Sequence, residues 1–156
     1  MSVYLSSQKI IKDWIDYNDH MNVSYYLLIF DKFGADTLND IFRMGEHSAK
    51  TTKKSTMMVE SHITYNQELL LNDKVDINLV YFDHDKKRLH LKLEMIEKKT
   101  KKISASIEWL SLYVNLEARK VTEFENEKIE IMDHFIDQNK DNFNNEDLKF
   151  SSKIKK

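Results

Sequence analysis

The sequence predicts an α+β domain in which a curved antiparallel sheet surrounds one long helix. Three observations support this fold class. Apolar residues recur at three- and four-residue steps in one long window near the N-terminus, which is typical of a helix. From Thr56 onward they alternate with polar residues, which is typical of half-buried strands. The 156 residues show no internal repeat, linker or change of composition, so one domain is expected.

The first element is a short alternating stretch from Tyr4 to Ile11, which we interpret as a strand. The long helix follows a polar segment, and Asn22 or Ser24 can cap its start. Gly45 is expected to close its end, because glycine accepts the backbone angles of a helix C-terminus. The apolar positions of this helix are Tyr26, Phe30, Phe33, Leu38, Ile41 and Phe42.

The alternating stretches predict long antiparallel strands followed by one short strand. The chain has no proline and only 2 glycines, so asparagine and aspartate are expected to take the turn positions. Turns are predicted at 83–85 and at 98–102. The strands are predicted at 59–66, 75–82, 89–95, 103–114 and 121–124.

A C-terminal helix is predicted from Ile129, Met132, Phe135 and Ile136, which follow the spacing of one helix face. The domain with this helix is expected to cover residues 1–140, and the polar tail 141–156 is expected to be loosely held. One helix inside one curved sheet leaves a sheet edge open. Dimerisation through that edge is therefore expected.

The composition excludes several classes of function. A net charge of −2, from 24 basic and 26 acidic residues, leaves no broad basic surface for nucleic acid. There is no cysteine, and none of His84, His90 and His134 has a metal-ligand partner at useful spacing, so no thiolate nucleophile and no metal are expected. The chain shows no signal peptide, and no apolar run approaches the ~20 residues of a membrane span. A cytoplasmic location without membrane contact is expected.

Polar side chains of several kinds are concentrated in residues 14–22, just before the predicted helix. One interpretation is helix capping by Asn22, with Asp19 at the positive helix end and side-chain turns at Asp16 and Asn18. The other is catalytic: the free N–H groups of a helix N-terminus stabilise a developing oxyanion beside a reactive carboxylate. The residue types alone favour capping.

A resemblance to a known family favours the catalytic interpretation. The run Asp16-Tyr17-Asn18-Asp19-His20-Met21-Asn22, followed by Tyr25-Tyr26 and Phe30-Asp31, resembles the active-site segment of hot-dog acyl-CoA and acyl-carrier-protein thioesterases. Similarity to the betainyl-CoA thioesterases of bacterial carnitine breakdown covers about residues 8–125. Its further parts are Glu60 to Tyr65, Asp85 to His90, Ser106 to Glu108 and, more weakly, Asn142 to Ile154.

Two positions depart from the family pattern. Asp19 stands where the family usually has glycine, and aspartate can adopt the left-handed turn conformation required there. This change also places a negative charge beside the expected oxyanion site. Ser152 and Lys153 stand where the family has a Gly-Arg pair.

The resemblance implies roles for single residues. Asp16 is the expected general base or nucleophile, Asn18 positions the water or the carbonyl, and His20 orients the substrate or transfers a proton. Glu60 is a further catalytic candidate, since it shares a strand face with His62, although a solvent-facing pair is the alternative. Aromatic faces bind a trimethylammonium group. The substrate-binding candidates are Trp14, Tyr17, Asn22, Tyr25, Tyr26, His62 and Trp109, with Trp14 and Tyr17 ranked first for the cation.

The resemblance therefore implies a thioesterase that hydrolyses a short acyl-CoA, with betainyl-CoA as the leading substrate and glycine betaine and CoA as products. CoA is part of the substrate and product, so no retained cofactor is expected. The alternative enzyme is a general short-chain or aromatic acyl-CoA or acyl-carrier-protein thioesterase. The alternative of another class is a non-catalytic acyl-CoA-binding module. The expected assembly is a homodimer or a dimer of dimers.

Overall fold

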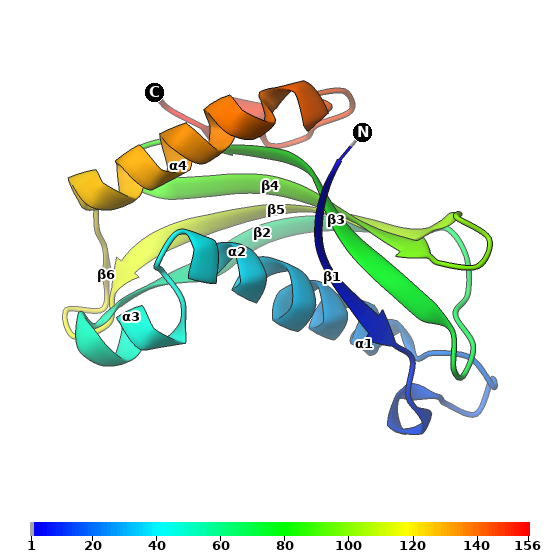
Figure 1. Ribbon diagram of the computed structural model, residues 1–156. Helices are drawn as coiled ribbons and strands as arrows, with labels where there is room; N and C mark the ends of the chain where they lie inside the picture. Colours follow the sequence, from blue (N-terminus) through cyan, green and yellow to red (C-terminus); the bar gives the residue numbers. More distant parts are fainter. Residues whose placement is uncertain (1) are drawn as a thin grey trace.

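A computed structural model describes residues 2–156 and shows a six-stranded antiparallel sheet that curves around a helical segment (Figure 1). The strand order is β1-β3-β4-β5-β2, and β6 pairs with the end of β5. This arrangement confirms the predicted α+β hot-dog fold. The strands are β1 (Val3–Lys9), β2 (Lys54–Tyr65), β3 (Lys74–His84), β4 (Arg88–Glu97), β5 (Ile103–Asn115) and β6 (Lys120–Val121).

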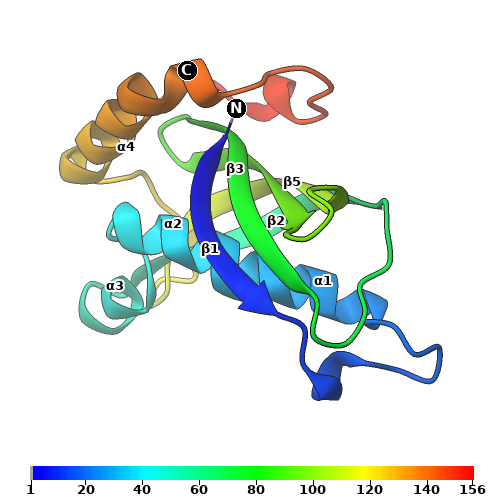
Figure 2. The same ribbon diagram turned by 45° about the vertical axis from the view of Figure 1, so that its right-hand side comes forward.

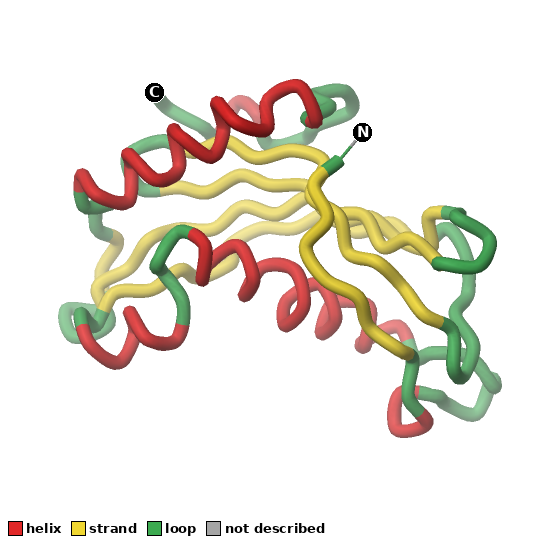
Figure 3. The backbone as a smooth tube through the Cα atoms, in the orientation of Figure 1, coloured by secondary structure: helices red, strands yellow, loops and turns green. Residues whose placement is uncertain are grey.

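The central helical segment consists of three consecutive parts. They are α1 (Val23–Phe30), a π-helical turn η2 (Asp31–Ala35) and α2 (Asp36–Ile41). The strands arch over this segment (Figure 3). Gly34 permits the close approach of helix and sheet, because a Cβ atom there would lie 2.7 Å from Leu93 Cδ1. The helix is therefore packed closely against the middle of the sheet.

The predicted helix end at Gly45 is wrong. The helix ends at Ile41, and Arg43 takes the left-handed conformation with a φ of 60° while its N–H donates to Asp40 O at 3.1 Å. Gly45 instead precedes the short helix α3 (Glu46–Thr51). Its lack of a side chain matters for packing, since a Cβ atom would lie 2.5 Å from Asp40 Oδ1.

The inner face of the sheet packs against the central helix, and the outer face points away from it. Ile77 and Leu93 face the central helix, since both lie within contact distance of a Cβ atom placed on Gly34. Ile107 is paired with Leu93 and shares this face. Because side chains alternate along a strand, Glu108 lies on the outer face. The main core thus lies between the inner face and the helix.

The predicted C-terminal helix is confirmed as α4 (Asn126–Asn139). It lies along the second half of β3, where β1 no longer pairs with that strand (Figures 1 and 2). Phe135 packs on Phe42 and Phe82, with ring centroids 5.2 Å and 5.9 Å away. Of the helices described in residues 2–156, none has the length and apolar character that membrane crossing requires. The last short helices are η3 (Lys140–Asn142) and η4 (Ser151–Lys153), and η1 (Lys12–Trp14) precedes α1.

The tail is not loosely held, contrary to the prediction. Asn144 N–H donates to Val80 O at 2.8 Å, and Lys149 N–H donates to Glu108 Oε2 at 2.7 Å on the outer face of the sheet. The side chain of Phe150 is buried. The polar composition of the tail did not predict these hydrogen bonds, because their donors are backbone N–H groups.

Candidate active site

The polar segment before α1 forms a closed loop. Ile15 and Met21 form an antiparallel bridge, and Asp16 N–H donates to His20 O at 3.1 Å. Asp19 has a φ of 61°, so it takes the left-handed conformation predicted for an aspartate at this position. The loop therefore returns the chain to the start of the helix and keeps both ends of the segment close together.

The carboxylate of Asp16 is fixed by two hydrogen bonds. Asn18 N–H donates to Oδ1 at 2.8 Å, and the side-chain amide of Asn22 donates to Oδ2 at 2.9 Å. These donors, first the Asn18 N–H and then the Asn22 amide, hold the pKa of Asp16 below its ordinary value. The group is therefore a carboxylate at neutral pH, as a general base or a nucleophile must be.

The start of α1 lies directly beside this carboxylate. Asn22 is the N-cap, as predicted, and its Oδ1 accepts hydrogen bonds from Ser24 N–H at 3.0 Å and Ser24 Oγ at 2.6 Å. Among residues 2–156, Val23 N–H makes no hydrogen bond. The first N–H groups of a helix carry partial positive charge, so Val23 N–H can donate to a developing oxyanion.

His20 lies on the other side of the loop. Its Nδ1 is 3.1 Å from Glu68 Oε2, and the side chain of His20 is 34% exposed. Glu68 was not predicted, because 48 residues separate it from His20. A pocket of about 290 Å³ lies beside them. Its lining residues are His20, Met21, Val23, Tyr26, Tyr65, Asn66, Gln67 and Glu68.

The aromatic candidates do not form one cage within a chain. Trp14 is buried and stacks on Tyr25 at a centroid distance of 5.9 Å. Tyr26 packs edge-on against Tyr65 at 5.2 Å, beside the His20 pocket. Tyr17 is 93% exposed. The structure therefore separates the two residues ranked first for the cation, Trp14 and Tyr17.

Glu60 and His62 share a strand face, as predicted, but this is the outer face of the sheet. His62 is paired with Glu108, and Glu60 with Leu110, which alternate with the inward-facing Trp109 on β5. Both side chains are exposed. Within one chain they form the solvent-facing pair that was the alternative prediction, and the sheet separates them from the central helix.

Trp109 instead lines a groove of about 740 Å³ between the central helix and the sheet. The groove begins at Ser24, next to the helix N-terminus, and its helix wall exposes Leu27 and Leu28. The charged residues of the groove are Asp31, Lys32, Asp36 and Glu46.

No part of residues 2–156 groups three or more His, Asp or Glu side chains in the way that a metal site requires.

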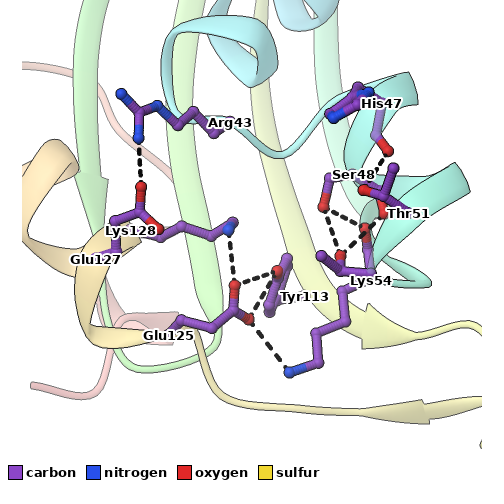
Figure 4. Close-up of polar contacts among 10 residues, drawn as sticks. Arg43, His47, Ser48, Thr51, Lys54, Tyr113, Glu125, Glu127 and Lys128 are labelled. Atoms are coloured by element: carbon purple, nitrogen blue, oxygen red, sulfur yellow. Dashed lines mark hydrogen bonds and ion pairs between the residues drawn. The ribbon is translucent and has the colours of Figure 1, made fainter.

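A second polar cluster lies at the opposite end of β2 (Figure 4). Glu125 accepts a hydrogen bond from Tyr113 Oη at 2.9 Å and pairs with Lys54 at 3.3 Å and Lys128 at 2.7 Å. Burial raises the pKa of Glu125. The three donors together lower this pKa by more than burial raises it, so it lies below its ordinary value. Lys54 and Tyr65 are the two ends of the 12-residue strand, about 36 Å apart, so the cluster joins elements away from the candidate site.

Comparison with known proteins identifies the family. Residues 11–137 match the model of the thioesterase-like superfamily. Over 118 residues the chain is 25% identical to a betainyl-CoA thioesterase of Pseudomonas aeruginosa, which covers 76% of this chain and 74% of the relative.

Solved structures show the same fold. A hypothetical protein of Staphylococcus aureus, solved in complex with CoA, aligns with a TM-score of 0.76 and 22% identity over 100% of this chain and 96% of its own. A DHNA-CoA thioesterase of the same organism aligns with a TM-score of 0.78 and 8% identity over 90% and 94% of the two chains. With most of its length matched by the family model, the chain belongs to the thioesterase-like superfamily and is a thioester hydrolase.

Proposed function

We propose that the protein hydrolyses an acyl-CoA, with Asp16 as the reacting carboxylate and Val23 N–H as a donor to the thioester oxygen. The strongest support is the geometry of Asp16: an ionised carboxylate, fixed by two donors, lies beside the start of a helix. The names of the relatives, several of which are CoA thioesterases, support CoA as the thiol.

Two routes are compatible with this site. As a general base, Asp16 takes a proton from water while the water oxygen attacks the carbonyl carbon. As a nucleophile, Asp16 attacks that carbon itself, the C–S bond breaks, and water then hydrolyses the mixed anhydride. In both routes the carbonyl oxygen becomes negative and Val23 N–H stabilises it. The CoA thiolate leaves and is protonated, a role that we assign to His20, the histidine of the same loop.

We propose a betainyl group as the acyl group, because the chain is similar to a betainyl-CoA thioesterase and because the groove that begins at Ser24 contains an indole. The groove contains Trp109. Its three carboxylates are paired with two lysines, since Lys32 contacts Asp31 and Asp36 and Lys50 contacts Glu46, so one negative charge remains in excess. An indole face attracts a trimethylammonium group as well.

The second candidate is a general short-chain or aromatic acyl-CoA or acyl-carrier-protein thioesterase. The apolar part of the same groove favours it. Leucine and methionine side chains from both walls can hold a neutral acyl chain. They are Leu27, Leu28, Met58, Leu89 and Leu91.

The test is free-thiol release from a panel of acyl-CoAs by the wild type and by Asp16→Asn. We expect the variant to lose about 10²- to 10⁴-fold in rate, since asparagine can neither accept the proton nor attack. Betainyl-CoA is compared with tert-butylacetyl-CoA, which has the same shape without the charge. A preference of about 2- to 30-fold for the charged ester is expected from one good aromatic contact.

Each other outcome points to a specific alternative. Equal rates on the two matched esters would leave a thioesterase and reject the cationic acyl group. Full activity in Asp16→Asn would reject the site. CoA-ester binding without any thiol release would support the non-catalytic binding module.

We also propose that the protein is a homodimer joined through β2. This strand is at the sheet edge, and it exposes Met57, Met58 and Val59, which are 38–53% accessible. Long exposed edge strands readily pair with another chain. Pairing there would also place a second copy next to the groove, since Met58 lines it.

A further inference from the structure

Lysine side chains gather at the end of the sheet that lies next to the candidate active site. Lys9, the last residue of β1, is directly paired with Lys74, the first residue of β3. Lys98 N–H donates to Lys74 O at 2.8 Å, which brings the turn after β4 to the same place. Lys99 is the next residue of that turn. We call Lys9, Lys74, Lys98 and Lys99 the lysine patch.

Three carboxylates lie near the patch, and each accepts hydrogen bonds from groups other than the lysine side chains: Asp73 from Leu70 N–H, Asp76 from Ser7 Oγ, and Glu97 from the turn after β4. Glu97 accepts hydrogen bonds from the N–H groups of Lys99 and Thr100 and from the Thr100 hydroxyl. Lys98 is 3.6 Å from Asp76. Within residues 2–156, the side chains of Lys9, Lys74 and Lys99 form no ion pair. Like charges directly opposite each other on two strands are destabilising, so a bound anion would be favourable here.

The patch borders a hollow that can receive a ligand. This hollow has a volume of about 410 Å³. Leu71 supplies an apolar wall that is 45% exposed, and the neighbouring Leu70 is 46% exposed. The lining residues are Leu71, Asn72, Asp73, Lys74, Glu97, Lys98 and Lys99. Cationic groups beside an exposed apolar surface suit a ligand that combines phosphates with a flat ring.

One loop contributes residues to both the hollow and the pocket beside His20. The chain between β2 and β3 lines the His20 pocket with Glu68 and lines the lysine hollow with Leu71. Three residue steps separate these positions, which is at most about 11 Å of chain. Between them, Leu69 O accepts a hydrogen bond from Met21 N–H at 2.8 Å, so the polar segment before α1 is attached to the chain between β2 and β3. Figures 1 and 2 both place the chain between β2 and β3 and the turn after β4 at the same end of the sheet.

We propose that the lysine patch binds the phosphates of the nucleotide part of the CoA ester, with Leu70 and Leu71 beside the adenine. This inference rests on the proposed function, since it assigns the far end of the same substrate. Lysine ammonium groups bind phosphates as point charges. A local excess of positive charge also attracts an anionic substrate over a distance, even though the whole chain has a net charge of −2.

The test compares two thioesters that share an acyl group. One is the CoA ester, and the other is the N-acetylcysteamine thioester, which has the same reacting bond and no phosphate. In the triple variant Lys74→Gln, Lys98→Gln and Lys99→Gln we expect kcat/KM for the CoA ester to fall at least about tenfold, mainly through KM. For the N-acetylcysteamine ester it should stay within about twofold. Added salt should weaken the wild type more than the variant.

A matched control removes the same charge elsewhere. Lys53, Lys86 and Lys120 lie in turns or strands at the opposite end of the sheet. Their replacement by glutamine should leave both rates unchanged. An equal loss in this control, or an equal loss on both esters in the patch variant, would overturn the inference.

A binding measurement separates this inference from the proposed function. Titration calorimetry with CoA itself requires no turnover. We expect the Kd of CoA to rise at least about tenfold in the patch variant and to stay unchanged in the control. An unchanged Kd in the patch variant would overturn the inference even if hydrolysis were found, whereas a raised Kd without hydrolysis would support the patch and reject the proposed function.

Discussion

Asn22 connects the structural and the chemical parts of the site. Its Oδ1 caps α1 through Ser24, while its Nδ2 donates to Asp16 Oδ2 at 2.9 Å. The same side chain therefore fixes the helix N-terminus and the carboxylate relative to each other. Under the proposed function, Asn22 would help to set the distance between the reacting carboxylate and the oxyanion donor, so capping and catalysis are compatible interpretations of this residue.

Two substitutions of Asn22 should separate these roles. Asn22→Ala removes both groups, and we expect a loss of about 1 kcal/mol in the free energy of unfolding. Asn22→Ser keeps a good cap but lacks the longer side-chain amide that donates to Asp16, so stability should remain while thiol release falls about 10- to 100-fold through misplacement of the carboxylate.

The pH profile of Asn22→Ser gives an independent readout. Loss of the Asn22 donor should raise the pKa of Asp16 toward its ordinary value of 3.8, so the acid limb of kcat/KM should move to higher pH than in the wild type. An unmoved limb, or full activity in the serine variant, would contradict the role of Asn22 in orienting Asp16.

Local patterns predicted the residues whose partners are near in sequence. The cap at Asn22 follows from the local pattern, and the left-handed Asp19 was expected from the resemblance to a family with glycine there; the structure confirms both. Glu68 could not be found in this way, because its contact with His20 spans 48 residues. For Glu60 and His62, alternation fixed that they share a face but not which face, and that depends on the whole sheet.

At the scale of elements, the tail is attached to the sheet by two buried carboxylates. Glu108 accepts from the N–H groups of Lys149 and Phe150 and from His90 Nε2 at 2.8 Å. Asp85 accepts from Lys155 N–H at 2.9 Å. Both carboxylates lie in segments that resemble the betainyl-CoA thioesterases, so this similarity includes positions that anchor the tail. Strand periods predicted β2 to β5 well, but backbone donors in a polar tail have no sequence signature.

Removal of the Glu108 anchor should destabilise the protein. Glu108→Ala leaves the buried His90 and two backbone N–H groups without their acceptor, and we expect a loss of about 3 kcal/mol in urea unfolding. In a chain that ends at Asp147 the same substitution should cost less, since both tail donors are absent. An equal cost in the two backgrounds would show that Glu108 does not act through the tail.

The pH dependence of this anchor has a defined sign. Burial raises the pKa of Glu108. The hydrogen bonds from the Lys149 N–H and His90 lower this pKa by more than burial raises it, so the pKa lies below the ordinary value of 4.5. The contribution of Glu108 is therefore complete above pH 4.5 and is lost as the pH falls through the lowered pKa. The stability difference between wild type and Glu108→Ala should accordingly shrink only in acid.

At the scale of the whole molecule, the sheet has two edges of different character. β1 closes one side over part of β3, and α4 covers the rest of that strand. β2 forms the other edge. Among residues 2–156, no strand pairs with the side of β2 that faces away from β5, along all 12 residues of the strand. The order of elements predicted this open edge, since one helix inside one curved sheet leaves one strand without a neighbour. The sequence could not show that the groove opens at the same edge, because its walls come from α1, β2, β4 and β5.

The proposed dimer should therefore depend on β2 and not on β1. The chain has a mass of 18.7 kDa, and light scattering on the wild type should give twice this value. Val59→Lys places a charge on the edge strand, which opposes pairing, so this variant should be monomeric and should lose activity as the groove loses its second copy. Tyr4→Lys is the matched control, since Tyr4 is 61% exposed on β1. A monomeric wild type would reject the dimer, and dissociation by Tyr4→Lys alone would place the interface at β1.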